Sequence, residues 1–170
     1  MYLVNHPTNG VFPSKHDIPR LVGNEASEKS LIALIDDDQS VLTSMKLLLE
    51  LEGHQVIAST NINDLMILLQ ADESIPSLIV ADYRLENDED GINAVSKIRN
   101  HTNHQIPALV ITGGVSSALE RLAHLNGCHL MPKSVSPDSF LELVSALIDG
   151  KANSPSSLKV KTPDMVEYKH

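Results

Sequence analysis

Four short apolar runs, each followed within two residues by a polar group, constrain this fold more than any other feature. The polar groups are, in chain order, Asp36-Asp37, Asp82, Thr112 and Lys133. Apolar runs of this length that alternate with helical patterns are typical of parallel strands buried on both faces of a sheet. Open sheets of this kind bind ligands outside the carboxyl ends of their strands. We therefore expect three carboxylates, a hydroxyl and an ammonium to meet at one edge of the sheet.

The chain alternates five times between a strand pattern and a helix pattern. The expected strands cover 31–35, 55–58, 78–82, 108–112 and 128–131. A helix is expected after each strand; Asp38, Asn61 and Ser136 are its predicted N-caps in three cases, the last followed by a proline. The leucine stripes on these helices are interpreted as core. Five such units without a second periodic region predict one doubly wound α/β domain.

Length and composition agree with a single domain. A chain of 170 residues with 42% hydrophobic residues can bury one core. Residues 30–149 hold all of the periodic pattern. Residues 1–29 contain three prolines and two glycines without sustained periodicity, and 150–170 read in the same way. We expect a disordered or loosely docked leader, a domain at 30–149 and a flexible tail.

Charge and cysteine content exclude several classes of protein. The formal charge is −9, and no cluster of Lys and Arg interrupts the acidic background, which argues against a nucleic-acid partner. The single cysteine, Cys128, excludes an internal disulfide framework and lies in an apolar run, where we expect it to be buried. No stretch approaches the roughly 18 to 20 apolar residues of a membrane span. We expect a soluble cytoplasmic protein without a membrane partner.

The acidic groups at the strand ends predict a magnesium site. Carboxylates held a few ångströms apart repel one another, and a cation relieves the repulsion. Mg²⁺ prefers oxygen ligands and keeps room for waters and a phosphate. Asp37 and Asp82 are expected to ligate the ion directly, with Asp36 acting through water. The most exposed carboxylate could attack phosphorus to form an acyl phosphate, while Lys133 and Thr112 hold phosphoryl oxygens.

Taken together, these motifs resemble the receiver domain of two-component response regulators over roughly residues 30–149. The segment from Asp82 to Gly91 and the Thr112-Gly113-Gly114 turn are most similar to receivers at the C-termini of hybrid histidine kinases. The resemblance rests on the following motifs: Ile35-Asp36-Asp37-Asp38, Ala81-Asp82-Tyr83-Arg84-Leu85 with Gly91-Ile92, Ile111-Thr112-Gly113-Gly114, and Lys133 before Ser136-Pro137.

The resemblance implies a fold and a set of roles. The fold is a flavodoxin-like, five-stranded parallel sheet in the order 2-1-3-4-5, with helices on both faces. Asp82 is implied to be the phosphoacceptor, Asp36 and Asp37 the acidic metal pair, and the carbonyl of Arg84 a further Mg²⁺ ligand. The phosphoryl group is implied to come from a histidine kinase or a histidine phosphotransfer protein. A downstream protein partner would bind the face made by helix 4, strand 5 and helix 5.

Two further roles and two departures concern the end of the sheet. The resemblance implies that Thr112 is the switch hydroxyl and Lys133 the phosphate-binding lysine. The family usually places a proline directly after this lysine, whereas Ser134 follows it here and Pro132 precedes it. Its common aromatic switch residue, three positions before the lysine, is Leu130 here. Lys133 could therefore sit in a different loop geometry, and signalling could run through helix 4 and loop motion.

Four alternatives stay open at this point. A phosphatase of the haloacid-dehalogenase type would use the Asp36-Asp37-Asp38 motif, with Thr112 and Lys133 as later motifs, but would leave Asp82 without a role. A pseudo-receiver would keep the fold as a binding module without phosphorylation. Thr112 could simply cap the following helix. His101 and His104 could be a metal pair, although no further ligand lies at a suitable spacing, which favours a solvated loop.

Overall fold

The computed structural model describes residues 29–86 and 89–151, so most of the predicted leader and tail, at 1–28 and 152–170, lies outside it. The described residues form five alternating strands and helices. The strands are β1 (Leu31–Ile35), β2 (Gln55–Ser59), β3 (Leu78–Asp82), β4 (Ala108–Thr112) and β5 (Cys128–Pro132). The helices are α1 (Gln39–Leu51), α2 (Ile62–Asp72), α3 (Gly91–Thr102), α4 (Ser117–Leu125) and α5 (Pro137–Ile148). The domain boundaries near 30 and 149 stay a prediction.

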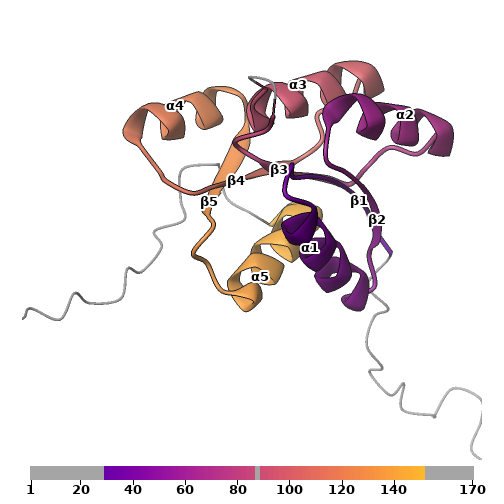
Figure 1. The fold of residues 1–170 in the computed structure, drawn as a ribbon, viewed down its shortest axis with the longest axis horizontal. Helices are drawn as coiled ribbons and strands as arrows, with labels where there is room; N and C mark the ends of the chain where they lie inside the picture. Colours follow the sequence, from indigo (N-terminus) through magenta and orange to yellow (C-terminus); the bar gives the residue numbers. More distant parts are fainter. Residues whose placement is uncertain (1–28, 87–88, 152–170) are drawn as a thin grey trace, which may run out of the picture.

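All five strands pair in parallel, in the order β2-β1-β3-β4-β5. The predicted fold class and strand order are therefore confirmed. The chain winds from β1 outward to β2, then crosses back past β1 to β3, so β1 and β3 flank the point where the winding direction reverses (Figure 1). Ligands bind at this point in open α/β sheets, and the two strands that flank it carry the acidic residues.

The helices cover both faces of the sheet (Figure 1). Helices α2, α3 and α4 pack on one face, and α1 and α5 pack on the other. Successive residues of a strand point to opposite faces, so Ala33 and Ile35 belong to the first core and Ile32 and Leu34 to the second. Every residue of β3 and β4 is buried, as expected for central strands covered on both sides.

The helix starts agree with the local sequence. Asp38, Asn61 and Ser136 accept hydrogen bonds from backbone amides of the first turn of α1, α2 and α5, which confirms them as N-caps. Ser116 caps α4 in the same way, so the alternative that Thr112 caps this helix is wrong.

The prediction that the leucine stripes belong to the core is wrong for part of α4. Leu119 and Ala123 are the buried residues of this helix, whereas Leu122 is 42% exposed and Leu125 is 82% exposed. At 100° per residue, Leu122 and Leu125 lie on one flank of the buried stripe, which faces solvent on so short a helix. Leu47 and Leu51 of α1 are exposed because they lie on the side of the helix opposite the buried Leu42 and Leu49. Among the described residues, none of the helices combines the length and apolar character that crossing a bilayer requires.

Candidate functional site

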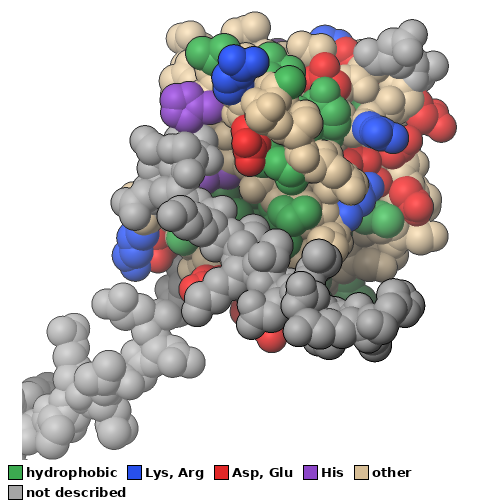
Figure 2. Space-filling model, turned by 90° about the vertical axis from the view of Figure 1, so that its left-hand side faces the viewer, with side chains coloured by type: hydrophobic (Ala, Val, Ile, Leu, Met, Phe, Trp, Pro, Cys, Tyr) green, Lys and Arg blue, Asp and Glu red, His purple; other side chains and the backbone are tan. Residues whose placement is uncertain are grey.

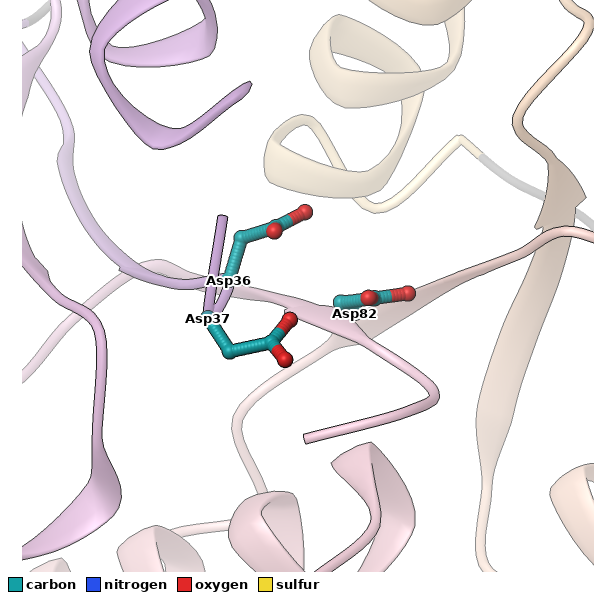
Figure 3. A group of neighbouring side chains, drawn as sticks. All are labelled: Asp36, Asp37 and Asp82. Atoms are coloured by element: carbon teal, nitrogen blue, oxygen red, sulfur yellow. The ribbon is translucent and has the colours of Figure 1, made fainter. Parts of the chain in front are cut away.

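Three carboxylates converge at the carboxyl edge of the sheet. Asp36 and Asp37 directly follow β1, and Asp82 is the last residue of β3. Figure 3 shows the three carboxylates pointing to the same side, and one ligand oxygen from each lies within 4.8 Å of the others. Asp36 and Asp82 are 2% and 5% exposed, so water screens their repulsion poorly. Asp37 is the most exposed of the three, so the expectation that the most exposed carboxylate is the nucleophile would select Asp37 and disagrees with the role implied for Asp82. The sequence prediction that these side chains meet is correct.

Lys133 supplies the positive charge that faces this cluster. Its Nζ donates to Asp82 Oδ2 at 2.9 Å and lies 3.5 Å from Asp36 Oδ2. Its backbone amide donates to the carbonyl of Thr112 at 2.7 Å, which continues the pairing of β4 with β5. Ser134 in place of the family's proline therefore does not displace the amine from the acidic site. Burial acts to lower the pKa of Lys133, but the hydrogen bond to Asp82 and the charges of Asp36 and Asp82 outweigh it and raise this pKa.

The metal-free cluster is short of positive charge. Burial raises the pKa of Asp36 above its ordinary value, and the charges of Asp82 and Asp37 add to the effect. The backbone amide of Asp38 and the ammonium of Lys133 act in the opposite direction without cancelling it. The ammonium of Lys133 alone therefore does not offset the burial of Asp36 and the charges of its two neighbours. Oxygen ligands at this spacing fit Mg²⁺, which would be held by Asp37 and Asp82 directly and by Asp36 through water.

Thr112 is at the predicted place, but its hydroxyl is occupied locally. The residue is 3% exposed at the end of β4. Its Oγ1 donates to the carbonyl of Gly114 at 2.9 Å and accepts from the amide of Gly114 at 3.3 Å. Thr112 is therefore brought to the same edge as the carboxylates with its proton directed into its own loop.

The loop after Asp82 is a short hairpin. Arg84 and Asp90 form an antiparallel bridge closed by hydrogen bonds from Leu85 N to Glu89 O and from Gly91 N to Tyr83 O. In such a pair, the N–H and C=O of Arg84 itself point away from the bridge, so its carbonyl takes no part in the bridge. Asp90 also caps α3 through Asn93 N. The hairpin thus returns the chain to the position where α3 begins directly behind Asp82.

Comparison with known proteins identifies the family. The model of the response regulator receiver domain matches residues 32–145. This chain belongs to that family. The match covers the sheet, all three carboxylates and Lys133. The family is one of signalling domains rather than conventional enzymes. A search of curated proteins finds no match to this sequence.

Solved structures show the same fold. A CheY-like receiver domain protein from Methanospirillum hungatei is 23% identical to this receiver domain, with a TM-score of 0.62 over 72% of this chain and 96% of that one. The BeF3-activated DrrB receiver domain is 19% identical, with a TM-score of 0.60 over 71% and 98%. The receiver of the hybrid histidine kinase CckA is 19% identical, with a TM-score of 0.57 over 69% and 98%. The last match is compatible with the predicted similarity to hybrid-kinase receivers.

Two of the alternatives lose their basis in this receiver domain. The haloacid-dehalogenase interpretation gave Asp82 no role, whereas Asp82 lies in the acidic cluster and bonds to Lys133. In the part of the chain that the structure describes, the three aspartates are the only group of three or more His, Cys, Asp or Glu side chains close enough to share a metal ion. His101 and His104 therefore have no third ligand there.

Cys128 is buried, as predicted.

Substituting Asp36 by Asn is expected to stabilise the metal-free receiver at neutral pH and to weaken Mg²⁺ binding. Because folding raises the pKa of Asp36, protonation of this group favours the folded state. This contribution to stability is fully present below the ordinary pKa and is lost as the pH rises through the raised value. At pH 7 its ionised form is a net cost that Asn removes. We expect a higher melting temperature without Mg²⁺ and Mg²⁺ affinity lower by about 10–100-fold.

Thermal unfolding with and without Mg²⁺, together with calorimetric titration, measures both effects. Asp38→Asn is the matched control, because it also removes one negative charge, two residues from Asp36, while asparagine remains a good N-cap for α1. A lower melting temperature for metal-free Asp36→Asn at pH 7 would contradict the prediction.

Proposed function

We propose that this receiver domain accepts a phosphoryl group on Asp82 in an Mg²⁺-dependent step. The observation that carries the proposal is the placement of Asp82 between two further carboxylates and an ammonium at the edge of the sheet. The carboxylates concentrate negative charge that a divalent cation would neutralise. Lys133 adds a positive charge beside Asp82 and Asp36. A phosphoryl group arriving at Asp82 would meet positive charge where its oxygens lie.

In the proposed step, a carboxylate oxygen of Asp82 attacks phosphorus and the bond from phosphorus to the donor's leaving atom breaks. The new bond is an acyl phosphate, and the donor keeps the bonding electron pair. For a phosphohistidine donor, the leaving group is the imidazole of a histidine kinase or a histidine phosphotransfer protein. The amine of Lys133 donates to Asp82 Oδ2, so it is placed to donate to one phosphoryl oxygen after the transfer. Mg²⁺, when bound, neutralises charge on the other oxygens.

Phosphorylation would then change the end of β4. A phosphoryl oxygen is a stronger acceptor than the carbonyl of Gly114, because it is charged. The hydroxyl of Thr112 would transfer its hydrogen bond from Gly114 to the phosphoryl group and release the loop before α4. Leu130 is partly buried against the core beneath α3 and α4 and replaces the family's aromatic residue. We propose that the signal leaves through this loop and α4.

The proposed output surface is the face made by α4, β5 and α5. Figure 2 views the molecule from the side on which α4 and β5 lie and shows hydrophobic side chains exposed among polar ones. Val115, Leu122 and Leu125 are exposed by 46%, 42% and 82% along and just before α4. In the proposed switch, α4 takes one position before phosphorylation and another after it. A downstream protein could bind these side chains in only one of the two positions.

We place the protein in the cytoplasm, in keeping with its single free cysteine.

Incubation with acetyl phosphate and Mg²⁺ tests the proposal. We expect incorporation of up to one phosphoryl group per chain, with the modified side chain identified by mass spectrometry as Asp82. Chelation of Mg²⁺ is expected to prevent the reaction. Undetectable incorporation, with BeF₃⁻ failing to bind as well, would favour a pseudo-receiver that works as a binding module. The use of BeF₃⁻ is suggested by the related DrrB receiver domain, which was solved in a BeF3-activated form.

A further inference from the structure

The C-terminal end of α4 is held by an arginine from α3. Arg99 donates from Nε to the carbonyl of Ile106 at 2.8 Å, and its two terminal nitrogens donate to the carbonyls of Asn126 and Gly127 at 2.6 and 3.0 Å. These partners lie before β4 and at the turn between α4 and β5. One planar guanidinium therefore ties α3 to two other backbone segments through three carbonyls, a geometry that lysine cannot reproduce.

The same end of α4 carries additional backbone and side-chain bonds. Asn126 is the C-cap of α4, and its side-chain amide donates to Leu122 O at 2.8 Å. Gly127 follows in the left-handed region at φ +59° and donates to His124 O. The positive charge of Arg99 sits on carbonyls at the negative end of the helix dipole, where it is favourable. The turn from α4 into β5 is thus held by Arg99, by the side chain of Asn126 and by backbone hydrogen bonds.

The N-terminal end of α4 is held by local bonds. The loop from Gly113 to Ser116 is exposed, and a Cβ added to either glycine would meet nothing within 4 Å. Thr112 bonds to Gly114, and Ser116 caps the helix through Leu119 N. The first of these bonds depends on the hydroxyl that the proposed phosphorylation would draw away.

From this asymmetry we propose that Arg99 is the pivot of the receiver's switch: it clamps the C-terminal end of α4 while the N-terminal end moves. The inference rests on the proposed phosphorylation of Asp82 and specifies how that event reaches the surface. Release of the Thr112–Gly114 bond frees the loop, and the helix tilts about the turn that Arg99 holds. The displacement is then largest at Val115 and Ala118 and smallest at Leu125. A partner would read the N-terminal part of α4.

Hydrogen exchange of the full chain tests this pivot, with Mg²⁺ and BeF₃⁻ as the phosphoryl probe. We expect amide exchange at 113–118 to change about fivefold or more on adding the probe, while exchange at 124–127 stays within about twofold. In Arg99→Lys the change is expected to spread to 124–127. Arg121→Lys, a substitution of an exposed arginine on the same helix, is expected to keep the gradient of the unmodified chain.

Each outcome decides the inference. A response at the acidic site together with an even change along α4 overturns the pivot and leaves the proposed function standing. An Arg99→Lys pattern identical to that of the unmodified chain also overturns it. If Arg99→Lys does not fold, the gradient in the unmodified chain decides alone. No response to BeF₃⁻ anywhere would count against phosphoacceptance at Asp82 and would overturn both proposals.

Discussion

Asp82→Asn is expected to lower phosphoryl incorporation from acetyl phosphate by about three orders of magnitude or more, which places it below detection. The amide has no anionic oxygen to attack phosphorus, and it removes one charge from the cluster that would hold Mg²⁺. The substitution preserves the shape of the side chain, and the amide oxygen can still accept from Lys133. Loss of incorporation would therefore reflect lost chemistry rather than a lost fold. Mass spectrometry of the intact chain measures the incorporation.

Asp38→Asn is the matched control for this experiment as well. It removes one negative charge two residues from Asp36, but Asp38 caps α1 and does not belong to the acidic cluster. We expect it to incorporate phosphate at nearly the rate of the unmodified chain. Sustained incorporation in Asp82→Asn, or turnover of many phosphate-ester equivalents by it, would place the nucleophile elsewhere and refute the assignment of Asp82.

The sequence predicts the sheet and the carboxyl edge well because both follow from short-range patterns. A run such as Leu78–Ala81 is too apolar to be exposed on either face, so it must be a central strand. Parallel pairing then places Asp36, Asp37 and Asp82 at one edge, whatever the details of the helices. The position of Lys133 follows in the same way from β5, and its backbone pairing with Thr112 survives the loss of the family's proline.

Other parts of the site depend on distances that no local pattern records. The direction of the Thr112 hydroxyl is decided by the conformation of the Gly113–Gly114 loop. The role of Arg99 depends on carbonyls 27 and 28 residues away, which periodicity cannot place. The exposure of Leu122 and Leu125 depends on how narrow a contact the short helix α4 makes with the sheet. Each of these features depends on packing between elements. The sequence alone therefore left the first two open and gave a wrong prediction for Leu122 and Leu125.

Gly91 shows how tightly the site is supported from behind. It is the first residue of α3 and lies where the hairpin after Asp82 returns to the sheet. A Cβ added there would overlap the carbonyl oxygen of Asp82, lie 3.0 Å from its carbonyl carbon and lie 3.2 Å from Ala81 Cβ. The groups in the way are mostly backbone atoms of a fully buried strand, so they cannot turn aside as a flexible side chain could.

Gly91→Ala is therefore expected to destabilise the domain by about 3 kcal/mol, the upper end of the usual cost of overpacking. Helix propensity predicts the opposite sign, since alanine is better than glycine by up to about 1 kcal/mol in a helix. The steric term is larger, so it decides the outcome. The melting temperature should fall by about 10 °C. Because relief of the overlap shifts the backbone of Asp82, Mg²⁺ binding should weaken along with stability.

Gly113→Ala is the control, because a Cβ there would meet nothing within 4 Å and the backbone does not require glycine. Its stability is expected to stay within about 0.5 kcal/mol of the unmodified chain. Denaturant unfolding of both variants, with Mg²⁺ titration of the folded protein, separates the steric effect from a general effect of adding a methyl group. A Gly91→Ala domain as stable as the unmodified one would mean that α3 does not press against Asp82, and the close support inferred for the acidic site would be wrong.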